Sequence, residues 1–219
     1  MTTRVARVET RPAVGTLVDR AAALAPDHGR AILGIAGLPG AGKTTLAAAL
    51  AAALAARLGH DAVVHVPMDG FHLADVQLDR LGLRDRKGAP ETFDAWGYAA
   101  LLARLRERAD AAVYAPGFER DLEQPIAAAV VVPPEARLVV TEGNYLLLDD
   151  PPWTAARTEL SEVWLVESED GERLRRLVAR HVQFGKSPDV AAAWVARSDE
   201  ANARLIRERS VAPDLVVSL

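Results

Sequence analysis

Gly37-Leu-Pro-Gly-Ala-Gly-Lys-Thr44 is the stretch that decides the fold of this chain. It fits the Walker A pattern G-x-x-x-x-G-K-[ST], in which backbone amides cradle phosphate groups. The apolar residues 30–36 before it predict a buried strand, and the alanine- and leucine-rich residues 44–58 after it predict a helix that stops at Gly59. The motif therefore sits between a strand and a helix, as phosphate binding requires. A tight glycine turn without a ligand is the less favoured interpretation.

Each residue type in this loop has a physical role. Glycines let successive N–H groups turn inward, and the helix that starts near Lys43 adds its positive end. The Lys43 ammonium reaches the β and γ oxygens of a nucleotide, and the Thr44 hydroxyl can bind Mg²⁺. We expect ATP as the nucleotide, although the motif does not separate ATP from GTP. The predicted nucleotide-binding residues are Gly37, Gly40, Ala41, Gly42, Lys43, Thr44 and Thr45.

The rest of the chain alternates short apolar runs with helical patterns. Strands are predicted over residues 62–67, 138–141, 162–166 and 214–218, and helices over 13–24, 94–109, 170–182 and 187–207. Alternating strands and helices predict a parallel sheet covered on both faces. We predict a three-layer α/β/α P-loop NTPase fold with a mostly parallel five-stranded sheet. The whole chain, residues 1–219, is expected to form one domain with a small helical lid at about 173–187.

Composition excludes several classes of protein. The chain has 219 residues, of which 50% are hydrophobic, and it has no cysteine. Disulfides, thiolate zinc sites, iron–sulfur clusters and cysteine nucleophiles are therefore excluded, and a reducing cytoplasm is expected. The net charge of −4 argues against a nucleic-acid partner. The longest apolar run, residues 46–56, is shorter than the roughly 20 residues that span a bilayer, so we expect no membrane association.

Two acids follow neighbouring predicted strands directly. Asp69 comes after strand 62–67, and Glu142 comes after strand 138–141. Ligands of open α/β sheets bind at the carboxyl ends of the strands, so both carboxylates should lie near the bound phosphates. A carboxylate beside an acceptor hydroxyl can take its proton during phosphoryl transfer, while a second one orders the Mg²⁺ shell. We assign Asp69 to the first role and Glu142, with Thr44, to the second. A strand-end cap is the alternative for each.

Several segments together resemble a known superfamily. Besides the loop, these segments are Asp69-Gly-Phe-His72, Arg86-Lys-Gly-Ala-Pro-Glu-Thr-Phe-Asp94, Tyr114-Ala-Pro-Gly-Phe118 and Glu142-Gly-Asn-Tyr145. From about residue 30 to its end the chain resembles the uridine kinase, pantothenate kinase and phosphoribulokinase superfamily of P-loop kinases. It looks closest to bacterial nucleoside/nucleotide kinase-like or fructose-transport-kinase-like proteins. The resemblance implies an ATP- and Mg²⁺-dependent kinase that phosphorylates a hydroxyl of a small molecule, with the acids after the second and third strands as base and Mg²⁺ ligand.

The identity of the acceptor stays open at this point. The uridine-binding pattern of uridine kinases and the long additional segments of pantothenate kinases are both missing from this sequence. A nucleoside, a sugar or a pantothenate-like alcohol therefore remain candidates. The predicted acceptor-binding residues are His72, Arg86, Lys87, Tyr114, Phe118, Glu142 and Tyr145. For the charged and aromatic members of this set, a solvated loop or ordinary packing is the alternative.

A stripe of arginines marks the predicted lid. Arg173, Arg176 and Arg180 are three and four residues apart, so they share one face of a helix. Such a stripe could close over the γ-phosphate, and the resembled superfamily has a lid in this place. We favour Arg176 and Arg180 as catalytic residues, with a solvated helix face as the alternative. The resemblance also suggests that Asn202 contacts the adenine. His65, inside an apolar strand, is predicted to be a hydrogen-bonded core residue.

Two other functions compete with a small-molecule kinase. A nucleotide-dependent switch would hydrolyse a nucleoside triphosphate without a small-molecule acceptor, but the guanine motif Asn-Lys-x-Asp is absent. A nucleic-acid end kinase would need a basic groove, which the net charge disfavours. The sequence leaves open whether the chain forms a homodimer.

Overall fold

A six-stranded parallel sheet forms the centre of the protein in the computed structural model, which describes residues 7–10, 12–107 and 111–219. The strand order is β1-β8-β7-β2-β6-β3. The strands are β1 Arg7–Thr10, β2 Ala31–Gly37, β3 Val63–Pro67, β6 Leu138–Gly143, β7 Glu162–Glu167 and β8 Leu215–Ser218. All five predicted strands lie in this sheet, and β1 adds a sixth strand beside β8.

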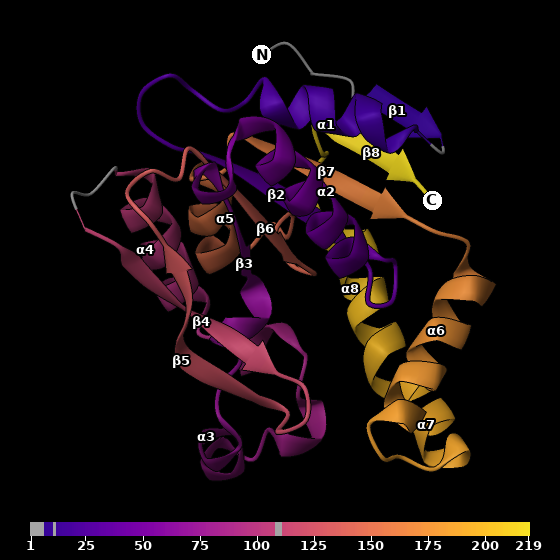
Figure 1. Ribbon diagram of the computed structural model, residues 1–219. Coiled ribbons are helices and arrows are strands. Elements are labelled where there is room, and N and C mark those ends of the chain that lie inside the picture. The colour runs from indigo at the N-terminus through magenta and orange to yellow at the C-terminus, as the bar shows by residue number, and fades with distance from the viewer. Residues whose placement is uncertain (1–6, 11, 108–110) are drawn as a thin grey trace.

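Helices cover both faces of the sheet, which confirms the three-layer prediction (Figure 1). Leu33 and Ile35 of β2 pack with helices α1 (Val14–Ala22) and α2 (Lys43–Leu58) on one face. Ile32, from the same strand, packs on the other face with α4 (Ala95–Arg106), α5 (Pro151–Thr158) and α8 (Glu200–Arg209). Since successive residues of a strand point to opposite faces, one continuous apolar run supplies both cores.

The ends of α4 follow from its flanking residues. Asp94 is its N-cap, and the carboxylate accepts a 2.9 Å hydrogen bond from the backbone N–H of Gly97. The helix ends at Arg106, whereas the sequence pattern predicts helix to residue 109. That predicted end lies outside the described residues.

The polar segment between β3 and α4 forms short helical elements. It contains helix α3 (Asp75–Leu81) and single 3₁₀ turns over Met68–Phe71, Arg84–Arg86 and Pro90–Thr92. After α4, the chain forms an antiparallel hairpin of β4 (Val113–Glu119) and β5 (Gln124–Val132). The hairpin and α3 project together from one end of the sheet (Figure 1).

Helices α6 (Asp170–Gln183) and α7 (Pro188–Trp194) project from the same end (Figure 1), and the predicted lid, about residues 173–187, covers most of α6 and the turn that leads to α7. A π-helical turn over Val195–Asp199 joins α7 to α8, so the predicted helix 187–207 is interrupted. Ser187 stands at the N-cap of α7, but its side chain makes no capping hydrogen bond. In the described part of the chain, no helix has both the length and the apolar character needed to cross a membrane.

Candidate functional site

The Walker A loop turns tightly between β2 and α2. Gly40 and Gly42 have φ values of 79° and 99°, in the left-handed region that favours glycine. A Cβ at Gly40 would lie 2.9 Å from the carbonyl oxygen of Arg173, so a larger residue would also clash. Lys43 begins α2, and its buried ammonium donates a 3.0 Å hydrogen bond to the Leu38 carbonyl. Burial lowers the pKa of Lys43 to about 8, against the opposing charges of Glu142 and Asp69.

Glu142 lies next to this loop because of strand register. Strand β6 pairs with β2 so that Glu142 stands opposite Ile35, close to where the loop begins. The Thr44 hydroxyl donates a 3.1 Å hydrogen bond to Glu142 Oε1, and Glu142 is only 4% exposed. Burial, together with the charge of Asp69, raises the pKa of Glu142 to about 7. A hydroxyl and a carboxylate at this distance form an oxygen donor pair of the kind that Mg²⁺ prefers.

Asp69 follows the adjacent strand β3, in which Pro67 pairs with Glu142. Its carboxylate oxygen Oδ2 accepts a 2.5 Å hydrogen bond from Arg120, and Oδ1 lies 4.0 Å from Nδ1 of His72. Burial by itself would raise the pKa of Asp69, but the neighbouring His72 and the positive charges of Arg120 and Lys43 together outweigh it and lower the pKa. Asp69 is therefore ionised at neutral pH and able to accept a proton.

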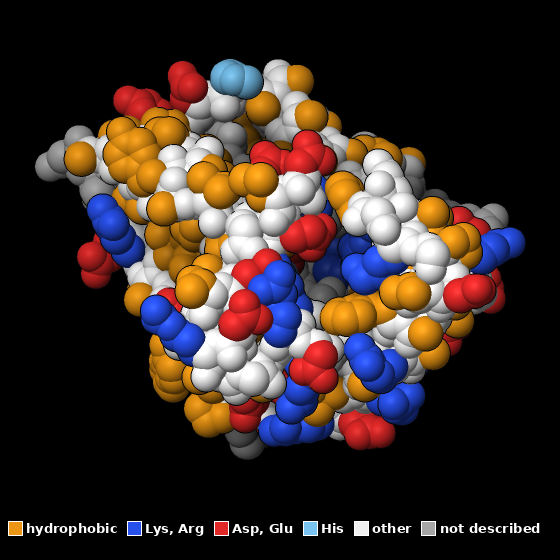
Figure 2. Space-filling model, turned by 90° about the horizontal axis from the view of Figure 1, so that it is seen from below, with side chains coloured by type: hydrophobic (Ala, Val, Ile, Leu, Met, Phe, Trp, Pro, Cys, Tyr) orange, Lys and Arg blue, Asp and Glu red, His pale blue; other side chains and the backbone are white. Residues whose placement is uncertain are grey.

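These groups share a cleft of about 520 Å³ between the hairpin side and the lid. Figure 2 shows that this face of the molecule is hollowed and that Lys, Arg, Asp and Glu side chains gather around the hollow. The phosphate-binding loop and strand ends contribute Pro39, Gly40, Lys43, Thr44, Asp69, Glu142, Gly143 and Asn144. The hairpin side contributes His72, Asp75, Arg84, Asp85, Lys87, Gly88, Phe118, Arg120 and Glu123. The lid side contributes Arg180, His181, Phe184, Lys186, Trp194, Asp199 and Asn202.

Most of the predicted site residues meet in this cleft. The loop residues Gly40, Lys43 and Thr44 line it, as do the residues Asp69, Glu142, His72, Lys87, Phe118, Arg180 and Asn202. The four other loop residues do not line the cleft: Ala41 is buried, Gly42 is half-buried near Arg176, Thr45 is exposed in the first turn of α2, and Gly37 ends β2. Asp69, Glu142 and Lys43, which the sequence analysis assigned to one site, thus lie in the same cleft.

Three residues predicted to contact the acceptor do not line the cleft. Arg86 points to solvent and pairs with Glu91. Tyr114 is 58% exposed on β4, away from the cleft. Tyr145 is fully buried, and its hydroxyl donates a 2.5 Å hydrogen bond to the Gly88 carbonyl, so it supports the loop behind the site. The sequence could not separate these three residues from those that line the cleft, because each motif segment contributes residues of both kinds.

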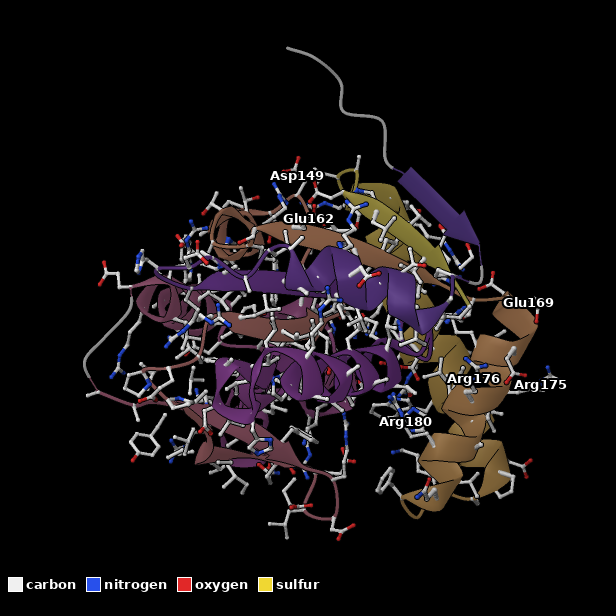
Figure 3. All side chains as sticks on the ribbon, turned by 45° about the horizontal axis from the view of Figure 1, so that its top comes forward. Asp149, Glu162, Glu169, Arg175, Arg176 and Arg180 are labelled. Carbon is white, nitrogen blue, oxygen red and sulfur yellow. The ribbon has the colours of Figure 1, made fainter. Side chains whose placement is uncertain are left out.

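Arg176 and Arg180 of helix α6 lie in different environments. Arg180 lies on the side of α6 that faces the body of the molecule, whereas Arg175 points outward (Figure 3). Arg176 forms a 2.8 Å ion pair with Glu172 and does not line the cleft, but a Cβ at Gly42 would lie 3.8 Å from its guanidinium. Arg176 is thus beside the phosphate-binding loop, and Arg180 faces the cleft itself.

Two features of the site escape sequence reasoning. The sequence suggests that Arg120, in the same Pro/Gly-rich stretch as Phe118, could line the acceptor site, but it does not predict the pairing of Arg120 with Asp69, which joins residues 51 positions apart. Asn202, predicted to contact adenine, donates a 3.2 Å hydrogen bond from Nδ2 to the Gly88 carbonyl. It therefore connects α8 to the same loop that Tyr145 supports.

Comparisons with known proteins found relatives that are named as kinases. No protein-family model matches the chain. A Schizosaccharomyces pombe protein named "Putative uridine kinase" is 34% identical over 207 residues, which cover 92% of this chain and 88% of that protein. An Aspergillus versicolor protein named "ATP-dependent kinase-like protein notR'" is 41% identical over 133 residues, 58% of this chain and 77% of its own. The crystal structure of a "putative fructose transport system kinase" from Silicibacter sp. TM1040 superposes with a TM-score of 0.85 at 37% identity, covering 94% of this chain and 98% of that one.

Proposed function

Because this chain belongs to the P-loop kinase superfamily that includes uridine kinase-like proteins, we propose that it transfers the γ-phosphate of ATP to a hydroxyl group of a small molecule. The observation that carries the proposal is the shared cleft. Lys43 of the phosphate-binding loop and Asp69, an ionised carboxylate, line the same cavity of about 520 Å³. The name of the Aspergillus relative supports ATP as the phosphate donor.

The arrangement suits phosphoryl transfer to an alcohol. The loop amides and the Lys43 ammonium would hold the β- and γ-phosphates and balance their charge. The acceptor hydroxyl would lie beside Asp69, whose carboxylate accepts the hydroxyl proton as the new oxygen–phosphorus bond forms and ADP leaves. Arg180, facing the cleft from α6, would approach the transferred group and help to exclude water.

A divalent cation fits the oxygen donors of this site. The Thr44 hydroxyl and the Glu142 carboxylate are 3.1 Å apart next to the loop, and both line the cleft. We propose that these two residues hold Mg²⁺ together with phosphate oxygens. When bound, the ion neutralises charge on the β- and γ-phosphates.

The test is an Asp69→Asn variant, which keeps the shape of the side chain and removes its basicity. ATP consumption is measured over a panel of nucleosides, sugars and hydroxy acids, and ATP affinity is measured separately by calorimetry. We expect turnover with the best acceptor to fall by roughly 10²- to 10⁴-fold while ATP affinity stays within about twofold.

An equal loss of turnover and ATP affinity would identify Asp69 as a structural residue and contradict its role as the base. Wild-type ATP consumption that no acceptor stimulates would favour the nucleotide switch. Thermal unfolding of the variant serves as the control for correct folding.

A further inference from the structure

Arg120 forms an ion pair with Asp69, the carboxylate that would act as the base. It lies in the turn between β4 and β5, and its guanidinium is 2.5 Å from Asp69 Oδ2 and 4.8 Å from the centre of the Phe118 ring. The Arg120 side chain is 38% exposed, so its end can change position without disturbing the core. A carboxylate that holds a guanidinium on one oxygen is a weaker proton acceptor than a free one. Removal of Arg120 from Asp69 should therefore accompany catalysis.

A second cation stands beside the same aromatic ring. The Lys87 ammonium lies 5.7 Å from the centre of the Phe118 ring and 2.7 Å from Asp75 Oδ1. Asp75 also holds Arg84, whose guanidinium is 2.8 Å from its other oxygen. One carboxylate is thus shared by two cations, of which Arg84 also pairs with Asp79 at 3.2 Å and Lys87 also donates to the Glu123 carbonyl oxygen. Asp85 and Glu123 also line the cleft, but both are exposed at its rim, where solvent screens their charge.

This charge distribution has a consequence for the acceptor. If Asp69 turns to an acceptor hydroxyl, Arg120 loses its anionic partner inside a partly buried cleft, next to a second cation whose carboxylate is already shared. Leaving a partly desolvated charge without a partner is unfavourable. An anionic group on the bound molecule would remove that cost. Guanidinium groups bind carboxylates and phosphates through paired hydrogen bonds, which makes Arg120 well suited to such a group.

We propose, on the basis of the proposed kinase function, that the phosphate acceptor carries a carboxylate or phosphate group besides its hydroxyl, and that Arg120 together with Lys87 binds this anionic group. Arg120 then moves from Asp69 to the acceptor, which frees the base only when a molecule of the right charge is present. A neutral alcohol of the same shape leaves Arg120 on Asp69. Arg120 is thereby a specificity-determining residue, and the hairpin turn that carries it senses the acceptor.

The experiment compares anionic acceptors with related neutral molecules. Hydroxy acids are each compared with their neutral primary amides, and sugar phosphates with their parent sugars, as acceptors in ATP consumption by the wild-type protein. We expect at least one anionic member to exceed its neutral partner by tenfold or more in kcat/KM. Activity confined to hydroxy acids would identify the group as a carboxylate, and activity confined to sugar phosphates would identify it as a phosphate.

Variants of Arg120 then test the residue itself. With Arg120→Gln, kcat/KM for the anionic acceptor should fall about 10- to 100-fold, chiefly through KM, as expected for a lost charge-assisted contact. The ratio between anionic and neutral partners should approach one, and the KM for ATP should stay within twofold. Arg120→Lys should recover part of the loss. Arg57→Gln removes another ion-paired arginine, which pairs with Asp19 on the surface, and should change none of these values.

The outcomes separate this inference from the proposed function. Efficient use of neutral acceptors in preference to their anionic partners would overturn the inference and leave the kinase function standing. An Arg120→Gln variant that retains the full preference for anionic acceptors would also overturn it. Absence of acceptor-stimulated ATP consumption across the whole panel would overturn the kinase function and the inference with it.

Discussion

The guanidinium of Arg173, on lid helix α6, donates a 3.2 Å hydrogen bond to the carbonyl oxygen of Pro39 in the phosphate-binding loop. The side chain is 1% exposed and is also held by Asp170 and by Glu200 of α8. It thus ties the first half of α6 to the loop and to α8. Arg173 is the structural member of the arginine stripe, while Arg180, two turns further along the helix, faces the cleft.

Replacing Arg173 should therefore affect stability first. In an Arg173→Met variant, the Pro39 carbonyl and the Glu200 carboxylate lose their buried partner, and we expect the free energy of unfolding to fall by about 3 kcal/mol. Urea unfolding followed by circular dichroism measures this change. The matched control is Arg175→Met on the same helix, where the side chain is 75% exposed and should contribute less than about 1 kcal/mol. An equal loss of unfolding free energy in the two variants would contradict the stabilising role of Arg173.

Arg180 should act on turnover and leave stability nearly unchanged. It faces the cleft from α6, and an arginine that stabilises the charge of a transferred phosphoryl group contributes about 10³- to 10⁵-fold in rate. Arg180→Gln should lower kcat by at least about 100-fold in steady-state ATP consumption. Arg176→Gln, which changes a neighbour outside the cleft, should lower kcat by less than tenfold. If Arg176→Gln has the larger effect on kcat, the assignment of the two residues is reversed.

Thr44 offers a separate test of the magnesium site. Thr44→Val preserves the shape of the side chain but removes the hydroxyl that contacts Glu142. We expect the Mg²⁺ concentration needed for half-maximal ATP consumption to rise by roughly tenfold or more. Thr158→Val, at the exposed end of α5, is the control, because its hydroxyl donates to the Ala155 carbonyl of its own helix. An unchanged Mg²⁺ requirement in Thr44→Val would exclude this hydroxyl as a ligand.

Local sequence patterns predicted much of the fold and the centre of the site. The Walker A loop requires glycine at Gly40 and Gly42, where φ is positive, and this requirement is visible in the sequence. Asp69 comes just after β3, and Glu142 is the next-to-last residue of β6, which runs two residues beyond the predicted strand 138–141. Both lie at the same edge of the sheet because parallel strands end there. These predictions needed only short-range rules and the direction of the strands.

The walls of the cleft depend on contacts between distant segments and could not be predicted in this way. Tyr145 and Arg86 belong to the same motifs as true cleft residues, but one packs beneath the Gly88 loop and the other points to solvent. Arg120 reaches Asp69 only because the hairpin folds back over the end of β3. Side-chain direction in loops and hairpins is set by tertiary packing, which no local pattern in this sequence encodes.

His65 departs from the sequence prediction of a hydrogen-bonded core residue. It alternates with Val64 and Val66 of β3 and therefore points to the α2 face of the sheet. Its Nε2 atom is buried and has no hydrogen-bond partner among the residues that the structure describes. Burial lowers the pKa of His65 from the ordinary value of 6.5, because the charged imidazolium is poorly solvated there.

This lowered pKa predicts acid sensitivity. Above about pH 6.5 the imidazole of His65 is neutral in the folded and in the unfolded protein, so it adds no pH dependence to stability. Below that value the unfolded chain binds a proton more readily than the folded protein does. The free energy of unfolding therefore falls as pH falls. His65→Gln removes this proton uptake, so its stability, measured by urea unfolding between about pH 8 and pH 5, should decrease less than that of the wild type. His60→Gln, an exposed position, is the control and should follow the wild-type curve. Parallel curves for wild type and His65→Gln would show that other groups, such as the buried His72, cause the acid sensitivity.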